Sequence, residues 1–347
     1  MGQWVNQPVV AQIAPVPRPV LAADVGGTHA RVALVVSQVH PREPVRVLAE
    51  GRYTGADWSS LTAILQHFLA ANAQMAPLGI ERCAIAIAGY VLGDAVANSN
   101  LPWPVSLSEI RASIGAETLD VINDFEAVAY ASQFVDREQT TTLLPGAADQ
   151  AHGPIVVMGP GTGLGSAVLL PGNANAQVLA TEAGQIALAP GDEREVAILR
   201  VLARTRPYVS VESIVSGPGL LATYRAIAEL DGHAAALATP DDVSAAGISG
   251  SDPSARSALE VFCAVLGGFT ADLAMLYGAT GGVFLAGGIL PNLCDFLLTS
   301  RFRERFFNKG VMRPFLERVP VRVVEHGQLG VVGAATMHAG ARVGAAH

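Results

Sequence analysis

The most informative stretch of this 347-residue chain is VLAADVGGTHARVALVV at residues 20–36. It reads as an apolar strand, a glycine turn that carries Thr28, and a second apolar strand. A second stretch, PIVVMGPGTGLGSAVLL at residues 154–170, repeats this pattern around Thr162. Backbone N–H groups that glycine turns expose form anion-binding concavities, and a threonine hydroxyl adds a donor. We therefore interpret both turns as phosphate-binding loops.

A candidate carboxylate base lies between these two turns in the sequence. The apolar residues Val121 and Ile122 read as the end of a strand, and Asn123 and Asp124 follow directly. A carboxylate at a strand end can accept the proton of a substrate hydroxyl. Two phosphate loops and one base are what an ATP-dependent phosphoryl transferase requires.

Other phosphate-binding motifs fit the chain poorly. A Walker loop needs a lysine before a serine or threonine and a helix after it, whereas the only lysine, Lys309, lies in no such motif. A dinucleotide fingerprint also needs a helix after its glycines, and here strands follow instead. The simpler alternative is that each glycine cluster is an ordinary hairpin turn. Because the pattern occurs twice, each time with a threonine, we favour phosphate binding.

The composition is that of an acidic globular protein. A length of 347 residues predicts two domains, and a net charge of −8 argues against nonspecific nucleic-acid binding. The scattered cysteines argue against a disulfide framework or a zinc knuckle. No apolar run approaches the roughly 20 residues of a membrane span, and residues 1–18 lack the features of a signal peptide. We expect a cytoplasmic protein without a membrane or nucleic-acid partner, and a flexible extension at residues 1–18.

The expected elements repeat one α/β topology in two halves. In the first half, two strands are expected within 20–36 and others at 45–52, 82–88 and 118–122, with helices at 59–73, 107–114 and 125–134. In the second half, the hairpin is followed by helices at 193–205, 218–230 and 255–277, a strand at 282–286 and a last helix at 331–343. The repeat predicts two similar lobes with a ligand cleft between them. We place a small domain at 19–134 plus 325–347 and a large domain at 135–324.

From about Leu21 to its C-terminus, the chain resembles the bacterial glucokinases of the hexokinase type, in the actin-like ATPase superfamily. The motifs that carry this resemblance are DVGGT at 24–28, SNLPW at 99–103, INDF at 122–125, GPGTGLG at 159–165, SGPGL at 216–220 and GGVFLAGGI at 281–289. The resemblance implies an α/β fold of two actin-like, ribonuclease H-like lobes of the βββαβα type. It also implies the phosphorylation of D-glucose to glucose 6-phosphate by ATP (EC 2.7.1.2), which feeds glycolysis.

The resemblance also assigns roles at the sugar site. Asp124 would be the general base, although a carboxylate before a helix is by itself more often a helix cap. The residues expected to bind sugar hydroxyls are Asn100, Asn123, Asp124, Glu182, Gln185 and Glu212. Carboxylates are well suited to this role because each oxygen accepts strong hydrogen bonds. We expect Trp103 to pack in the core or a loop rather than to stack on a sugar.

At the nucleotide site, the resemblance implies ATP and Mg²⁺ between the lobes. Asp24 would orient the metal ion through water, since Mg²⁺ usually keeps several waters. The residues expected around the nucleotide are Gly26, Gly27, Thr28, Gly161, Thr162, Gly163, Gly287 and Gly288. Because no motif lysine is available, the metal ion and backbone dipoles must stabilise the transferred phosphoryl group. Arg31 could contribute, or it could be a charge on a strand face.

Three residues depart from the family pattern. Such glucokinases usually have Glu-Gly-Gly-His where this chain has glutamate, Ala183, glycine and Gln185 at 182–185, and His29 replaces a usual asparagine. A lost hydrogen bond costs ~0.5–1.5 kcal/mol, so these changes could weaken glucose binding or shift the sugar preference. Two alternatives therefore stay open. The chain could be a kinase for another hexose or an amino sugar, or it could be a weakly binding sugar sensor.

Two further expectations follow from the resemblance. The family often forms homodimers, and a dimer is the commonest closed assembly. We also expect the two lobes to close on the sugar about a hinge near the helix after Asp124 and near residues 325–327.

Overall fold

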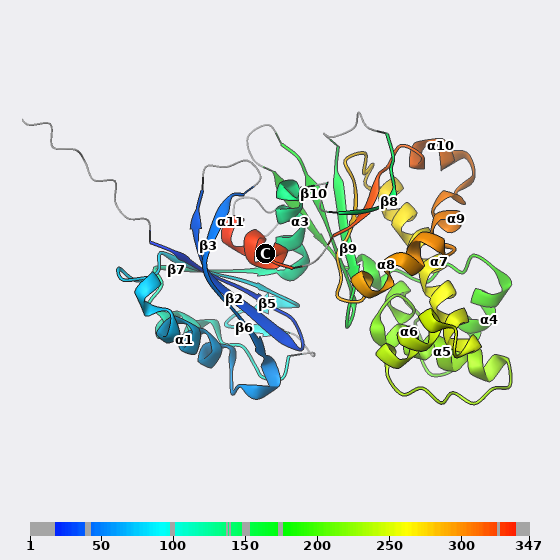
Figure 1. The fold of residues 1–347 in the computed structure, drawn as a ribbon, viewed down its shortest axis with the longest axis horizontal. Helices are drawn as coiled ribbons and strands as arrows, with labels where there is room; N and C mark the ends of the chain where they lie inside the picture. Colours follow the sequence, from blue (N-terminus) through cyan, green and yellow to red (C-terminus); the bar gives the residue numbers. More distant parts are fainter. Residues whose placement is uncertain are drawn as a thin grey trace, which may run out of the picture.

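The computed structural model describes residues 18–38, 43–97, 101–136, 138, 140–147, 153–172, 176–324 and 327–337. Figure 1 shows two α/β lobes side by side, each built around its own sheet. This arrangement confirms the predicted fold class. The extension expected at residues 1–18 lies outside the described residues, apart from Arg18.

The sheet of the first lobe has the strand order β3-β2-β1-β4-β7. Its strands are β1 (Val20–Val25), β2 (His29–Ser37), β3 (Val45–Thr54), β4 (Arg82–Ile87) and β7 (Thr118–Asn123). The first three strands form an antiparallel meander, and β4 and β7 continue the sheet parallel to β1. The predicted glycine hairpin is thus confirmed as the β1–β2 turn.

The sheet of the second lobe repeats this order and adds one strand, as β11-β10-β9-β12-β13-β8. Its strands are β8 (Thr141–Leu144), β9 (Ile155–Pro160), β10 (Leu164–Leu170), β11 (Gln177–Thr181), β12 (Gly282–Leu285) and β13 (Val321–Val323). As in the first lobe, three consecutive strands, here β9, β10 and β11, form an antiparallel meander, and β12 and β13 run parallel to β9. The second glycine turn joins β9 and β10, so the predicted repeat is confirmed.

Two helices cover the outer face of the first sheet. They are α1 (Leu61–Ala71) and α2 (Leu107–Ile114). Successive residues of a strand point to opposite faces, and β1 follows this rule. Leu21 packs with the apolar faces of α1 and α2, whereas Ala22 faces the opposite side, toward the second lobe.

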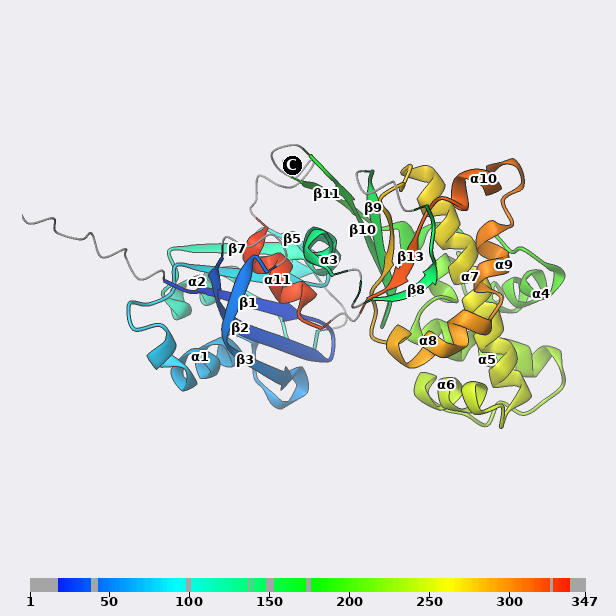
Figure 2. The same ribbon diagram turned by 45° about the horizontal axis from the view of Figure 1, so that its top comes forward.

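The helices α3 (Asp124–Ala131) and α11 (Leu329–Thr336) lie between the two sheets in both views (Figures 1 and 2). They follow the last parallel strand of each lobe, β7 and β13, and pack in one core with residues from both sheets. The two helices approach very closely, because a methyl group at Gly333 would lie 1.9 Å from the carbonyl oxygen of Ala127. The two helices therefore pack as one layer between the sheets.

The end of α11 is fixed to the first lobe by the buried side chain of Arg82. Its guanidinium donates hydrogen bonds to the backbone oxygens of Ala335 and Met337, and it forms an ion pair with Asp120 at 3.0 Å. The C-terminal helix thus belongs structurally with the first sheet. The expected domain boundaries at 134 and 325 stay a prediction.

The remaining helices cover the second sheet. They are α4 (Glu193–Leu202), α5 (Gly217–Leu230), α6 (Pro240–Ser249), α7 (Pro253–Leu276), α8 (Leu290–Thr299), α9 (Phe302–Phe307) and α10 (Arg313–Leu316). By length and composition α7 could cross a membrane, which qualifies our expectation that no run approaches a span. However, 78% of its most apolar stretch is buried inside the protein. It is the central core helix of the second lobe.

The structure corrects several expected elements. A hairpin of β5 (Tyr90–Leu92) and β6 (Ala95–Ala97) lies where no strand was expected. The strands β8, β11 and β13 and the helices α6, α8, α9 and α10 were also missed. The last helix begins two residues earlier than predicted and ends at Thr336, because Met337 has an extended backbone. Residues 338–343 of that expected helix, and residues 325 and 326 of the expected hinge, lie outside the described residues.

Candidate active site

Three strand ends bring the first-lobe site residues together. In the parallel register, Val25 of β1 pairs with Ile87 of β4, which pairs with Asn123 of β7. The carboxyl ends of parallel strands meet at one edge of a sheet, where ligands usually bind in open α/β sheets. The register therefore places the first glycine turn and Asp124 at the same edge.

Asp124 is the first residue of α3, and its environment favours the protonated form. Burial is the main cause, and the negative charges of Asp24 and Glu182 add to it, so that the pKa of Asp124 rises to about 6. One carboxylate oxygen accepts a hydrogen bond from the backbone N–H of Phe125 at 3.0 Å, which partly offsets this rise. A base is most effective when its pKa lies near the working pH. The position suits a general base.

The helix cap at this position is Asn123 rather than Asp124. The side-chain oxygen of Asn123 accepts hydrogen bonds from the backbone N–H groups of Phe125 at 2.9 Å and Glu126 at 3.3 Å. The carboxylate of Glu126 returns the contact by accepting from the backbone N–H of Asn123 at 3.1 Å, which completes a capping box. The alternative role considered for Asp124 thus belongs to its neighbour. The side-chain N–H₂ of Asn123 donates to the backbone oxygen of Gly89 at 3.5 Å.

Asp24 is the second-last residue of β1 and lies against the first turn of α11. A methyl group at Gly330 would lie 2.4 Å from the carboxyl carbon of Asp24, so only glycine leaves room for this side chain. In the turn that follows, the backbone N–H of Gly26 donates to the oxygen of His29 at 3.0 Å. Thr28 and His29 are exposed, which leaves the threonine hydroxyl accessible to a phosphate.

The second glycine turn is held by its own backbone and by α5. The N–H of Gly161 donates to the oxygen of Gly163 at 2.8 Å, and the N–H of Gly217 donates to the oxygen of Gly161 at 2.9 Å. Thr162, between the two turn glycines, is exposed. The turn therefore presents its threonine outward on a fixed backbone.

Glu212, in the short 3-10 turn Val211–Ser213, contacts this same glycine turn. Its carboxylate accepts a hydrogen bond from the backbone N–H of Leu164 at 2.8 Å. A methyl group at Gly163 would lie 2.7 Å from the bonded oxygen, so the glycine is needed for the approach of the carboxylate. One oxygen of Glu212 is thus engaged by the expected phosphate turn. The structure brings a predicted sugar residue and a predicted phosphate residue into contact.

The start of α5 is a part of the site that the sequence analysis missed. Ser216 caps the helix by accepting from the N–H of Gly219 at 3.0 Å, and Pro218 lies in the first turn. Helix N-termini favour anions because their free N–H groups and the helix dipole point toward them. The motif at 216–220 carries the serine cap and early proline that are typical of a helix start, which was the signal available in the sequence.

The structure separates the roles of Gly287 and Gly288. A methyl group at Gly287 would lie 2.3 Å from the oxygen of Pro160, so close packing of β9 explains this glycine without a ligand. Gly288 is exposed, and a methyl group there would meet no atom within 4 Å. Of these two glycines, both expected around the nucleotide, Gly288 is the one with free space beside it.

Two of the expected second-lobe sugar residues, Glu182 and Gln185, lie in the loop after β11, whereas Glu212 lies in the short 3-10 turn Val211–Ser213. Burial and the negative charge of Glu212 raise the pKa of Glu182. The backbone N–H of Gln185 donates to the oxygen of Glu182 at 3.0 Å, and the hydroxyl of Tyr208 donates to the oxygen of Gln185 at 2.6 Å. The loop backbone is thus fixed, while the side chain of Gln185 is exposed. Asn100 lies outside the described residues.

The basic residues considered for phosphate binding are paired elsewhere. Arg31 forms an ion pair with Glu50 at 3.1 Å on the β2–β3 face, and Lys309 forms one with Asp272 at 2.6 Å. Arg31 also lies opposite Asp24 in the β1–β2 register, so its contribution to phosphate binding stays a prediction.

The acidic residues fit a magnesium ion whose remaining ligands come from water and the substrate. Within the described part of the chain, no group of three or more histidine, cysteine, aspartate or glutamate side chains could hold a metal ion alone. Asp24 and Asp124 are close enough for the charge of one to raise the pKa of the other, so a cation between them would relieve that repulsion. Mg²⁺ is commonly held by one or two carboxylates, with water and substrate phosphates as the other ligands.

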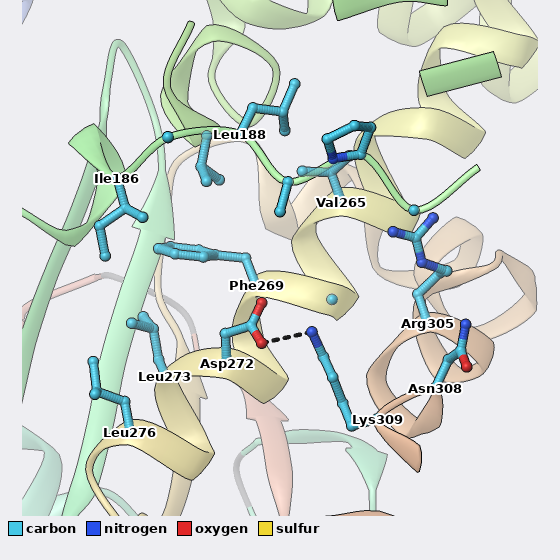
Figure 3. Close-up of a pocket in the computed structure, with 16 residues that line it drawn as sticks. Ile186, Leu188, Val265, Phe269, Asp272, Leu273, Leu276, Arg305, Asn308 and Lys309 are labelled. Carbon is cyan, nitrogen blue, oxygen red and sulfur yellow. Dashed lines mark hydrogen bonds and ion pairs between the residues drawn. The ribbon is translucent and has the colours of Figure 1, made fainter. Parts of the chain in front are cut away.

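A separate cavity of about 320 Å³ lies in the second lobe, next to the loop that carries Glu182 and Gln185 (Figure 3). Leu188, Val265 and Phe269 form its apolar wall, and the ion pair of Asp272 with Lys309 closes one side. None of the predicted catalytic or nucleotide residues lines it. It is therefore distinct from the meeting point of Asp24 and Asp124.

The comparisons with known proteins agree with one another. A family model described as "Glucokinase" matches residues 21–341. A "Glucokinase-like protein" of Xylella fastidiosa is 45% identical, over 91% of this chain and 93% of the relative. The glucokinase of Paramagnetospirillum magneticum is 39% identical over 91% and 96%. A crystal structure of glucokinase from an Antarctic psychrotroph is 36% identical, with a TM-score of 0.80 over 91% of this chain and 97% of that one.

Proposed function

Since the chain belongs to the glucokinase family, we propose that it transfers the γ-phosphoryl group of ATP to D-glucose and forms glucose 6-phosphate. The observation that carries this proposal is the position of Asp124, directly after β7 at the sheet edge that also carries Asp24 and the first glycine turn; its raised pKa supports it. Such a carboxylate accepts a proton near neutral pH. The product would enter glycolysis in the cytoplasm, and a homodimer is the expected assembly.

In the proposed reaction, Asp124 accepts the proton of the sugar 6-hydroxyl as its oxygen attacks the γ-phosphorus. Thr28, Thr162 and the N–H groups of the two glycine turns hold the phosphates. Asp24 would hold Mg²⁺, which neutralises charge on the phosphate oxygens when bound. The N-terminus of α5 adds dipole stabilisation beside the second turn.

Sugar recognition would come from both lobes. Glu182 and Glu212 supply acceptors for sugar hydroxyls, and the side-chain N–H₂ of Asn123 supplies a donor. Glu212 also bonds Leu164 next to the second turn, so the position of the sugar and that of the phosphates are set by the same side chain. Closure of the lobes about α3 and α11 would align the hydroxyl with the γ-phosphate. Identical lobe angles in sugar-free and sugar-bound crystals would argue against closure.

One observation favours a second candidate, a kinase for another hexose. The family's usual histidine is replaced by Gln185. The side chain of Gln185 is exposed, and the hydrogen bond from Tyr208 goes to its backbone oxygen. A glutamine side chain can reorient to other hydroxyl patterns, whereas an anchored imidazole is more selective. The sensor alternative is weaker, since Asp124 retains the environment of a base.

The test is ADP release with Mg-ATP and a panel of hexoses that includes mannose, fructose, galactose and glucosamine. Phosphorus and proton NMR of the product would identify the phosphorylated hydroxyl. We expect glucose to give the highest kcat/KM and a 6-phosphate product. Turnover with another hexose only would replace the glucose assignment, and binding without turnover would favour the sensor.

A further inference from the structure

The cavity in the second lobe has an apolar side and a side rich in hydrogen-bond donors (Figure 3). Leu188 and Phe269 belong to the apolar side, whereas Asn308 and Lys309 line the other. The volume of about 320 Å³ lies at the lower end of the range of small-molecule pockets. A ligand that fills this cavity is therefore small, with an apolar body and one polar group.

A buried ion pair holds one end of the cavity in shape. The guanidinium of Arg305 pairs with the fully buried Glu195, with Nη2 3.2 Å from Oε2. The same carboxylate accepts a hydrogen bond from the backbone N–H of Gly191, in the cavity wall, at 2.6 Å. A methyl group at Gly191 would lie 1.8 Å from Nη2 of Arg305, so the guanidinium packs directly on this wall. Because Glu195 neutralises its charge, Arg305 shapes the cavity rather than attracting a ligand.

Lys309 is the cation in the cavity that is placed to bind a ligand. Its ammonium bonds Asp272 at 2.6 Å, and the two side chains are 21% and 48% exposed. An ammonium carries three N–H donors, so Lys309 can bind a second acceptor while Asp272 keeps the first. Solvent-exposed ion pairs contribute little to stability, so this pair can rearrange around a ligand at small cost. Lys309 beside an apolar wall therefore suits a small amphipathic carboxylate.

The wall of the cavity also adjoins two expected sugar residues. Residues 186–191 line the cavity and directly follow Gln185. The backbone N–H of Val211 donates to the oxygen of Ile186 at 2.9 Å, and both of these residues line the cavity. Val211 directly precedes Glu212. The cavity thus lies against the junction between the two segments that carry the expected sugar residues of the second lobe.

These two segments carry carboxylates that repel each other. After burial, the negative charge of Glu212 is the second cause of the raised pKa of Glu182. A ligand that contacts Ile186 and Val211 together stabilises their pairing against this repulsion. Because a ligand shifts a protein toward the arrangement that it binds better, it would hold both carboxylates in place for a sugar.

We propose that the cavity binds a small amphipathic carboxylate as an effector that strengthens glucose binding. The apolar body of the effector packs on Leu188 and Phe269, and its carboxylate accepts a hydrogen bond from Lys309. The binding site stands without the proposed function, whereas the effect on glucose rests on it. Coupling between two sites is reciprocal, so glucose must strengthen binding of the effector by the same factor.

The test measures binding of 3-phenylpropanoate to the full chain by NMR titration, with the neutral 3-phenylpropanamide as the matched compound. We expect saturable binding of the carboxylate and at least about fivefold weaker binding of the amide, because hydrogen bonds between charged groups are the stronger ones. Glucose should lower the dissociation constant of the carboxylate, and the carboxylate that of glucose, by one shared factor of at least about two.

Two variants of the ion pair should act in opposite directions. Lys309→Met removes the cation and should weaken binding of 3-phenylpropanoate about tenfold. Asp272→Asn removes the competing carboxylate and should strengthen that binding about 2- to 5-fold. Arg204→Met is the control, because it breaks an exposed ion pair with Glu229 and neither residue lines the cavity. This control should bind 3-phenylpropanoate as wild type does.

The outcomes separate the site, its effect and the proposed function. No saturable binding by wild type, equal binding of the amide, or unchanged binding in both Lys309→Met and Asp272→Asn would overturn the site. Carboxylate binding that glucose leaves unchanged, in a wild type that phosphorylates glucose, would overturn the effector role. A wild type without hexose turnover would instead overturn the proposed function, and opposite effects of the two variants would still support the site.

Discussion

Phe125 and Gly165 meet between the two lobes, and the contact leaves no room for a side chain at the glycine. A methyl group at Gly165 would lie 2.0 Å from Cδ2 of the phenyl ring. Phe125 directly follows Asp124 in the first turn of α3, whereas Gly165 lies on β10 of the second lobe. The position of the candidate base is thus tied to the strand after the second phosphate turn.

Gly165→Ala should displace the first turn of α3 and misplace Asp124. Overpacking of this kind costs about 1–3 kcal/mol in the free energy of unfolding, and a displaced catalytic group can cost about 10- to 100-fold in kcat. Thermal melts and steady-state kinetics would measure both. Gly268→Ala is the control, since a methyl group there would lie 3.7 Å from the guanidinium of Arg305, an ordinary van der Waals distance. Wild-type kinetics in Gly165→Ala would show that the contact does not position the base.

The pH dependence of the rate should report the environment of Asp124. Because its pKa is raised to about 6, kcat/KM should fall about tenfold per pH unit on the acid side of that value. An ordinary aspartate would keep the enzyme active to below pH 5. A profile of kcat/KM for glucose between pH 4.5 and 8 decides between the two. A flat profile down to pH 5 would contradict the assigned environment.

Asp124→Asn should stabilise the folded protein at neutral pH. The folded carboxyl keeps its proton up to about pH 6, whereas the unfolded one loses it near 4. The wild-type free energy of unfolding therefore falls as pH rises from about 4 to about 6, and asparagine removes that loss, which is on the order of 1–3 kcal/mol. Urea melts at pH 4 and pH 8 would test this. If the free energy of unfolding differed between variant and wild type by the same amount at both pH values, the explanation would be refuted.

Gln185→His should improve glucose binding. The substitution restores the residue usual in the family on a loop whose backbone is already held by Tyr208. One added hydrogen bond is worth roughly 3- to 10-fold in affinity, so KM for glucose should fall by about that factor with little change in KM for ATP. Gln133→His, on the exposed turn after α3, is a surface control for the substitution itself. A higher KM for glucose would indicate that this chain uses glutamine for another sugar.

The local signals in the sequence predicted those elements that have clear caps. The bounds of α2 were predicted as observed, because Ser106 caps its start at 3.2 Å and Gly115 ends it in the left-handed conformation, with φ of 65°. The two glycine hairpins were predicted because apolar strands flank each turn. The capping box of Thr239 and Asp242 is an equally clear signal for the start of α6, but the sequence analysis did not use it.

Contacts between distant segments were beyond the sequence analysis. Strands β8 and β13 have four and three residues, too few to show an alternating pattern, and they exist because the sheet pairs them. The contact between Glu212 and Leu164 joins residues 48 positions apart, so the reason for glycine at 163 was not visible. The hydrogen bond from the indole N–H of Trp103 to the backbone oxygen of Gly55 was not visible in the sequence either, since the two residues are 48 positions apart.

The measurement that tests the account most directly is glucose-dependent ADP release by wild type, Asp124→Ala and Lys309→Ala. Removing a general base lowers kcat by about 10²- to 10⁴-fold, and we predict a loss of this size in Asp124→Ala with the fold retained. Lys309→Ala removes the only lysine, which pairs with the half-exposed Asp272 on the second lobe, and should keep nearly wild-type turnover. Wild-type turnover in Asp124→Ala, or loss of turnover in Lys309→Ala, would contradict the proposed mechanism.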